Sequence, residues 1–119
     1  MKVLISARGD SLDAEVDPRF GRCAYLMLVD AKSRTILSAE RNEYANAAGG
    51  AGTRTARRAV DLNAEVILTG KIGPKALEVL QECGVRYCTG ASGSVRDALD
   101  AFARGDLSES ASNPGSVRG

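Results

Sequence analysis

The chain has 119 residues, of which 44% are hydrophobic and 26% charged, and this is the size and composition of one globular domain. Sixteen basic and fifteen acidic residues leave a net charge of +1, which provides no overall field to attract nucleic acid or an anionic membrane. No apolar run approaches the roughly 20 residues of a membrane span, and three cysteines without a secretory signal favour the reducing cytoplasm.

Apolar periodicity predicts five strands and three helices in the order βββαβαβα. The short connection 31–33 between the second and third strands indicates a hairpin. Gly73 and Pro74 open the second helix, and Ser94 caps the third. The strands are expected at 2–6, 24–30, 34–40, 65–70 and 85–90, and the helices at 53–63, 73–84 and 94–105.

The connections between these elements predict the fold class. A hairpin joins antiparallel strands, whereas helical crossovers join parallel neighbours with right-handed geometry. We therefore expect an α/β fold with a mixed five-stranded sheet, order 3-2-1-4-5, in which strand 2 is antiparallel and helices cover both faces. Residues 1–105 form the single expected domain, and 106–119 a flexible C-terminal tail, because that segment is rich in Ser, Asn, Pro and Gly.

Glycine-rich turns gather at one edge of this predicted sheet. Ligands of open α/β sheets bind beyond the carboxyl ends of the parallel strands. Four segments are expected there, FGRC (20–23), NAAGGAGT (46–53), TGKIG (69–73) and TGASG (89–93), together with three helix N-termini whose free N–H groups favour anions. Their glycines are Gly21, Gly49, Gly50, Gly52, Gly70, Gly73, Gly90 and Gly93, and Arg8, Arg22 and Lys71 add positive charge. One glycine is ordinary in such a turn, but eight at one edge predict an anion-receptive mouth.

Catalytic and phosphate-binding patterns are missing from the sequence. GGAGTRT lacks the spacing and the lysine of a P-loop, and no GxGxxG follows the first strand. The chain has no His, so its serines lack a histidine base, and ordinary zinc and non-haem iron sites are not expected. We therefore expect no catalytic residues and no enzyme activity.

The three cysteines differ in their expected locations. Cys83 continues the apolar stripe of the second helix and is expected in the core. Cys23 and Cys88 fall at the glycine-rich edge, where two interpretations stay open, a structural thiol or a soft-metal ligand. No CxxC motif accompanies them, so a four-thiolate cluster is not expected.

Five stretches resemble the dinitrogenase iron–molybdenum cofactor biosynthesis family: KVLIS, LDAEVDPRFGRCAYLMLVD, NAAGGAGTRTA, EVILTGKIGPKALEVLQECGV and SGSVRDALDAF. The resemblance covers residues 1–105 and implies a ribonuclease-H-like fold without nuclease chemistry. It also implies a role in carrying or storing preformed metal–sulfur clusters. The short single-domain form is most similar to the orange proteins of sulfate-reducing bacteria, which implies a molybdenum–copper–sulfide cluster held non-covalently.

Such a cargo agrees with the residues present. A cluster that brings its own sulfide needs N–H donors, cations and an apolar wall, and close backbone approach through glycine supplies the donors. Phe20 and Ile72 are expected to provide apolar contacts. Many family members carry a histidine near the glycine loop, but this loop reads NAAGG here (46–50). The sequence therefore favours non-covalent binding of the cluster, or ligation by Cys23, over ligation by an imidazole.

We therefore expect a cytoplasmic, non-enzymatic protein that carries a molybdenum–copper–sulfide cluster to a recipient protein, without nucleic-acid or membrane partners. Two alternatives stay open. The first is a carrier of an iron–sulfur or iron–molybdenum nitrogenase-cofactor precursor. The second is a regulatory module whose glycine edge binds a nucleotide or a partner protein.

Overall fold

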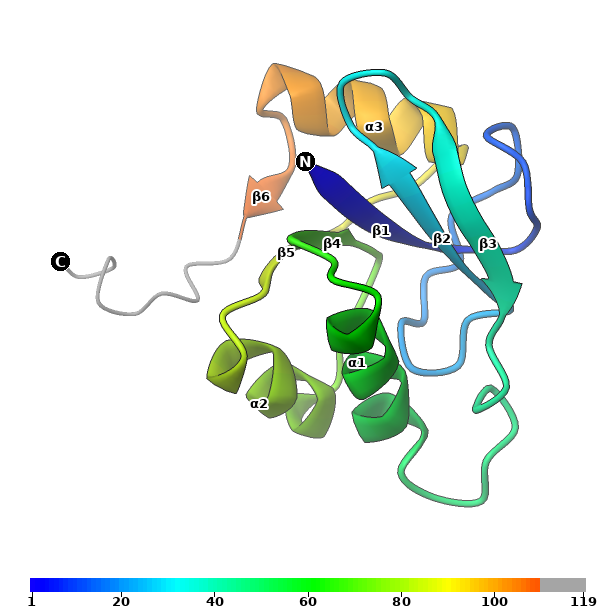
Figure 1. Cartoon of the computed structure of the whole chain (residues 1–119), viewed down its shortest axis with the longest axis vertical. Helices are drawn as coiled ribbons and strands as arrows, with labels where there is room; N and C mark the ends of the chain where they lie inside the picture. The colour runs from blue at the N-terminus through cyan, green and yellow to red at the C-terminus, as the bar shows by residue number, and fades with distance from the viewer. Residues whose placement is uncertain (110–119) are drawn as a thin grey trace, which may run out of the picture.

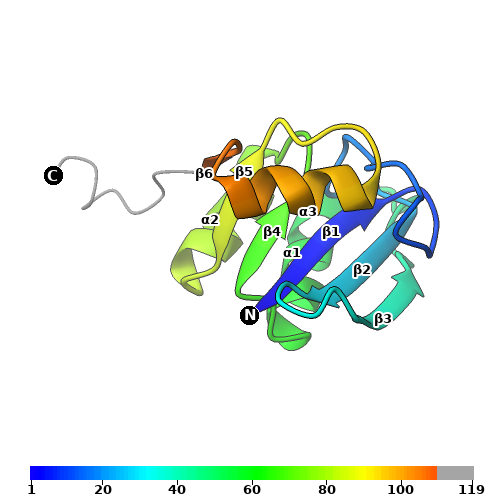
Figure 2. The ribbon, with the colours of Figure 1, turned by 90° about the horizontal axis from the view of Figure 1, so that it is seen from above.

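A β-sheet between two helical layers forms the centre of the computed structural model, which describes residues 1–109 (Figures 1 and 2). The strands are β1 (Lys2–Ala7), β2 (Tyr25–Asp30), β3 (Ile36–Arg41), β4 (Val66–Leu68), β5 (Arg86–Thr89) and β6 (Ser108–Glu109). The helices are α1 (Ala51–Asp61), α2 (Pro74–Glu82) and α3 (Val95–Arg104). None of the helices in this part of the chain is long and apolar enough to cross a membrane.

The sheet has the order β3-β2-β1-β4-β5-β6. β1 pairs parallel with β4 and β4 parallel with β5, whereas β2 is antiparallel to both β1 and β3. The mixed directions, the order of the first five strands and the helices on both faces agree with the prediction. The predicted number of five strands is wrong, because a sixth strand joins the sheet, and the likeness to ribonuclease H stays a prediction.

The sixth strand lies within the segment that was expected to be a tail. Ser108 and Glu109 pair antiparallel with Thr89 and Cys88 at the outer edge of β5. Two hydrogen bonds between the Arg86 guanidinium and the Glu109 carboxylate hold the pair together. A polar dipeptide of this kind has no apolar pattern, so periodicity cannot reveal it. The rest of the expected tail, 110–119, lies outside the described residues.

Successive side chains of each strand point to opposite faces of the sheet, and this divides the core into two layers. Leu4, Leu26 and Ile67 point to the face covered by α1 and α2, whereas Ile5 and Met27 point to the face covered by α3. Figure 2 shows this arrangement, with α3 alone on its side of the sheet. The sheet therefore separates the core side chains of the two faces.

Cys83 does not lie in the core. It is exposed at the C-cap of α2, so its expected burial is wrong. The apolar stripe of α2 reaches Leu80, which is fully buried, but the helix ends at Glu82, one residue before Cys83. The helical spacing that would continue the stripe no longer applies there.

Candidate functional site

The loop between β1 and β2 folds back over the carboxyl ends of the parallel strands. The Asp17 backbone N–H donates to the Ser6 carbonyl at 2.9 Å, and the Ser6 hydroxyl donates to the Asp17 carbonyl at 2.7 Å. The Lys71 N–H donates to the Pro18 carbonyl at 2.8 Å, and the Phe20 N–H to the Lys71 carbonyl at 3.1 Å. This loop therefore occupies part of the crevice in which the sequence predicts a ligand.

The N-terminus of α3 is closed. The Ser94 hydroxyl accepts a hydrogen bond from the Asp97 N–H at 3.0 Å, and the Asp97 carboxylate accepts one from the Ser94 N–H at 3.1 Å. This capping box satisfies two donors and places a negative charge in the first turn. Gly93 accepts a hydrogen bond from Val16, and Gly90 donates one to Gly70. The segment with Gly90 and Gly93 thus leads to a capped helix, and its part in ligand binding stays a prediction.

The N-termini of α1 and α2 are open and lie side by side. Neither helix has a side-chain hydrogen bond at its N-cap or an acidic residue in its first turn. A Cβ atom on Gly52 would lie 3.4 Å from the Ala76 Cβ atom, so the first turns of the two helices are in contact. Their free N–H groups and positive dipole ends act on the same patch of surface. We call this patch the α1–α2 mouth, and it consists of Gly21, Arg22, Gly49–Gly52 and Lys71–Gly73.

Most of the predicted residues in the α1–α2 mouth are accessible. Arg22, Gly49, Gly50, Lys71 and Gly73 are exposed. Ile72 is half-buried against the core on the α1 side of the sheet, where it can still present an edge. Three predicted residues are placed differently. Phe20 is only 1% exposed and packs in that core, Gly70 packs under Pro18, and Arg8 lies beside Glu15, which pairs with Ser94 at the start of α3.

Arg22 connects the two loops of the mouth. Its Nη1 atom donates to the Ala45 carbonyl at 2.9 Å and to the Ala47 carbonyl at 3.2 Å. The side chain therefore holds the segment that leads into the glycine loop, while its remaining N–H groups stay at the surface. Sequence reasoning assigned Arg22 only as a charge for the ligand.

Asn42 and Thr55 form a buried polar cluster beneath the mouth that sequence reasoning missed. The Asn42 Nδ2 atom donates to the Gly21 carbonyl and to the Thr55 hydroxyl, each at 3.2 Å, and the Thr55 hydroxyl donates to the Gly21 carbonyl at 3.0 Å. Asn42 is 7% exposed and Thr55 is fully buried. This cluster ties the end of β3 and the helix α1 to Gly21. The sequence signal is weak, a single polar residue directly after a strand.

The two candidate cysteine ligands lie on opposite faces of the sheet. Cys23 is fully buried on the α1 side, and Cys88 is 1% exposed on the α3 side. Burial, followed by the charge of Asp17, raises the pKa of Cys23 to about 12. Burial, followed by the charge of Glu109, raises the pKa of Cys88 to about 11. Both are protonated thiols at neutral pH, whereas a metal ligand must be a thiolate. Ligation by either cysteine stays a prediction.

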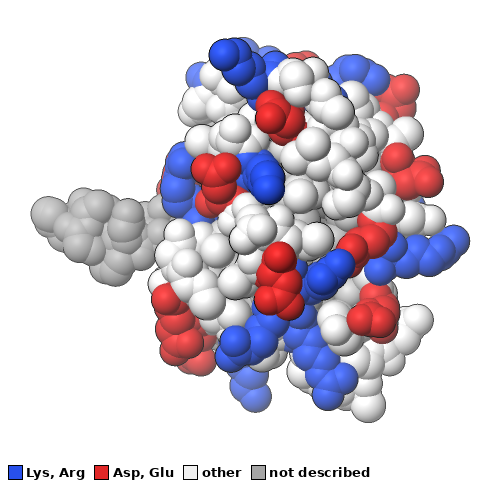
Figure 3. Space-filling view, viewed as in Figure 1, with Lys and Arg blue, Asp and Glu red and all other residues white. Residues whose placement is uncertain are grey.

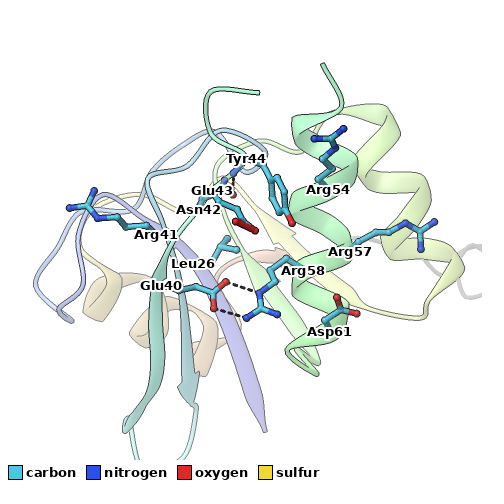
Figure 4. Close-up of a pocket in the computed structure, with 10 residues that line it drawn as sticks. All are labelled: Leu26, Glu40, Arg41, Asn42, Glu43, Tyr44, Arg54, Arg57, Arg58 and Asp61. Atoms are coloured by element: carbon cyan, nitrogen blue, oxygen red, sulfur yellow. Dashed lines mark hydrogen bonds and ion pairs between the residues drawn. The ribbon is translucent and has the colours of Figure 1, made fainter. Parts of the chain in front are cut away.

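A groove of about 690 Å³ lies between β3 and α1, next to the mouth (Figure 4). We call it the β3–α1 groove. It is lined by Leu26, Glu40, Arg41, Asn42, Glu43, Tyr44, Arg54, Arg57, Arg58 and Asp61. None of these residues was selected from the sequence. Figure 3 shows acidic and basic side chains interspersed over this side of the molecule, with several basic side chains adjoining in its lower part.

Comparison with known proteins places the chain in a family. The model of the family described as "Dinitrogenase iron-molybdenum cofactor" matches residues 1–105. The apo form of the orange protein from Desulfovibrio gigas is 34% identical, with a TM-score of 0.87 and 92% of each chain covered. A Thermotoga protein described as NifB-like and as a member of the DUF35 family is 30% identical, with a TM-score of 0.78 and 91% of each chain covered. An uncharacterized protein of Methanocaldococcus jannaschii is 29% identical over 94 residues, which is 77% of this chain and 80% of that protein. The chain therefore belongs to the dinitrogenase iron–molybdenum cofactor family.

Proposed function

We propose that this protein is a non-enzymatic carrier that binds a metal–sulfur cluster at the α1–α2 mouth. The observation that carries the proposal is that two uncapped helix N-termini meet exposed glycine backbone, in a chain 34% identical to an orange protein. We further propose that the cargo is a molybdenum–copper–sulfide cluster and that it passes to a recipient protein.

The donor groups at the mouth suit an anionic cluster that brings its own sulfide. Backbone N–H groups in the first turns of α1 and α2 can donate to sulfide, and their dipoles favour negative charge. Gly49 and Gly73 have no heavy atom within 4 Å of a Cβ position, so their backbone faces open space that a cluster can approach. Arg22 and Lys71 add two exposed positive charges.

The mouth does not suit a cluster ligated by protein side chains. Within residues 1–109, no group of three or more His, Cys, Asp or Glu side chains could hold a metal ion. Cys23 lies beneath the mouth, with its Sγ atom 3.8 Å from the Asn42 amide, but it is fully buried there. We therefore propose that Cys23 supports the loop and does not ligate the metal.

Reconstitution tests the proposal directly. The purified protein is incubated with tetrathiomolybdate and a copper salt and passed over a gel-filtration column. We expect visible charge-transfer absorption to elute with the protein, with molybdenum and copper found in that fraction by elemental analysis. Absorption that elutes only with the small molecules would contradict the proposal.

The alternative cargo is an iron–sulfur or iron–molybdenum nitrogenase-cofactor precursor. The family description names an iron–molybdenum cofactor, but it does not say which metals this chain binds. Metal analysis of protein isolated from its native host separates the two cargoes. Iron in stoichiometric amount, with copper absent, would favour the precursor.

A further inference from the structure

The β3–α1 groove lies outside the α1–α2 mouth and has the size of a small-molecule site. Its volume of about 690 Å³ falls within the range of ligand pockets, which is roughly 300–1,000 Å³. Leu26 is 1% exposed and belongs to the apolar core beneath the groove. Polar side chains from β3 and from α1 line the two sides of the groove, so a ligand there would meet polar groups on both sides.

One wall of the groove comes from a single side of α1. Arg54, Arg57, Arg58 and Asp61 follow the spacing i, i+3, i+4 and i+7. Arg58 reaches across to β3, where its Nε and Nη2 atoms donate to the Glu40 carboxylate at 2.7 and 2.8 Å. This pair lowers the pKa of Glu40 through the hydrogen bond from Arg58. The pair fixes both side chains and leaves the Arg58 Nη1 atom outside the interaction (Figure 4).

Charges of both signs remain available around this pair. Arg54 enters no ion pair among residues 1–109, and the same holds for Glu43 and Asp61. In Figure 4 Arg54 lies at the loop end of the groove, close to Tyr44, whereas Arg57 points away from β3. The Tyr44 ring is directed into the space between β3 and α1. The pKa of Tyr44 is raised, first by its hydrogen bond with Glu43, so its hydroxyl stays protonated.

This mixture of groups indicates the class of ligand. A ligand carrying only negative charge would meet Glu43 and Asp61, and one carrying only positive charge would meet Arg54 and Arg58. A phosphate binds arginine through charge-assisted hydrogen bonds, and sugar hydroxyls donate to carboxylates, as in dinucleotide sites. Tyrosine offers an apolar ring beside a polar hydroxyl. A phosphorylated sugar satisfies both kinds of group at once.

We propose that the β3–α1 groove binds a phosphorylated sugar, either free or as part of a nucleotide. Arg54 and the free Nη1 atom of Arg58 take the phosphate, and the Glu43 carboxylate accepts from the sugar hydroxyls. The site lies beside the loop that supports the mouth, because the Tyr44 N–H donates to the Asn42 side chain at 3.1 Å and Asn42 is tied to Gly21. A bound ligand would therefore contact the loop that leads to the glycines of the mouth.

Isothermal titration with four probes tests this inference: inorganic phosphate, ribose 5-phosphate, AMP and ATP. We expect saturable binding of ribose 5-phosphate or a nucleotide that is clearly tighter than binding of inorganic phosphate. AMP binding tighter than ribose 5-phosphate would assign the site to nucleotides, and equal binding would assign it to the sugar phosphate. Absence of saturable binding to any sugar-containing probe at millimolar concentration would overturn the proposal, as would equal affinity for inorganic phosphate.

Two variants and a control locate the binding. Arg54→Gln removes a charged donor from an exposed side chain and should weaken binding at least about tenfold, the effect of losing one charge-assisted hydrogen bond. Glu43→Gln should weaken ribose 5-phosphate binding, whereas inorganic phosphate should bind no more weakly than to the wild type, because a carboxylate that repels the anion is removed. The control Lys32→Gln changes the same charge at the exposed hairpin between β2 and β3 and should bind as the wild type does. An equal loss in Arg54→Gln and Lys32→Gln would show nonspecific attraction and contradict the inference.

Discussion

The backbones of Gly21 and Gly52 are in direct contact, because a Cβ atom added to Gly21 would lie 2.8 Å from the Gly52 Cα atom. This contact joins the loop before β2 to the first turn of α1. The Gly21 carbonyl is also the common acceptor of Asn42 and Thr55. Glycine is therefore required at position 21 for packing, in addition to any role in ligand binding.

The contact predicts that Gly21→Ala destabilises the fold by about 1–3 kcal/mol, the usual cost of an inserted methyl group in a packed region. Urea unfolding followed by circular dichroism measures the difference. Gly49→Ala is the matched control, since its Cβ atom would have no neighbour within 4 Å, and it should change the free energy of unfolding by less than about 0.5 kcal/mol. Equal stability of the Gly21→Ala variant and the wild type would show that the two loops separate without cost.

Blocking the exposed glycines of the mouth should abolish cluster retention without unfolding the protein. Gly49 and Gly73 lack a left-handed φ and have open space at the Cβ position, so Gly49→Val and Gly73→Val fit the existing backbone. Their side chains would cover the N–H groups that we assign to the cluster. Gly50 is a poorer position for this test, because its φ of 75° strains any other residue.

The measurement is the charge-transfer absorbance that elutes with protein after reconstitution with tetrathiomolybdate and copper. Ser92→Val changes an exposed residue in the turn before the capped helix α3 and serves as the control. Retention at the wild-type level in both glycine variants would move the cluster site away from the α1–α2 mouth.

Local patterns predicted most of the fold, because they act within one element. Buried β-branched runs such as 2–6 indicated the strands, and Pro74 marked the start of α2. β6 depends on the open edge of β5 and on the pair between Arg86 and Glu109, which are 23 residues apart. A contact of that kind follows from the topology and cannot be seen in the segment itself.

The candidate site was predicted less completely, for two reasons. Ser94 caps α3 as expected, but the capping box that it forms with Asp97 also occupies two backbone N–H groups. Fewer free N–H groups are therefore left at one of the three helix N-termini that the sequence predicted for the site. The buried cluster of Asn42, Thr55 and the Gly21 carbonyl requires the end of β3, the helix α1 and the loop before β2 to meet. Neither spacing nor residue type specifies that meeting.

Arg22 should act on the cluster by holding the glycine loop as well as by charge. Arg22→Gln removes the donor to the Ala45 and Ala47 carbonyls, so we expect faster amide hydrogen exchange in residues 44–48 of the cluster-free protein. Cluster retention should fall in the same variant. Lys32→Gln, which removes an exposed charge at the hairpin between β2 and β3, is the control and should keep the wild-type exchange in this loop. Weaker retention with unchanged exchange would assign Arg22 to charge alone.

The cysteines should differ sharply in reactivity. Cys83 is exposed, whereas Cys23 and Cys88 are buried and protonated, so Ellman's reagent should modify one thiol per native chain and three after unfolding. Cys83→Ser should then show no rapid reaction. Rapid modification of a second thiol in that variant would show that a buried cysteine is accessible and would reopen its assignment as a metal ligand.

The raised pKa values of the buried thiols predict a loss of stability at alkaline pH. Unfolding lets Cys23 and Cys88 ionise at the ordinary value of 9.0, whereas in the folded protein they ionise at about 12 and about 11. Between these values the folded state binds more protons than the unfolded state, so their contribution is complete below pH 9 and is lost as the pH rises above it. Each thiol therefore lowers the free energy of unfolding by at most about 1.4 kcal/mol per pH unit in this range.

Urea unfolding from pH 8 to pH 11 measures this loss. The free energy of unfolding should decline less for Cys23→Ala than for the wild type, while Cys83→Ala, which removes an exposed thiol, should follow the wild type. Identical declines in all three proteins would contradict the burial of a protonated thiol at Cys23.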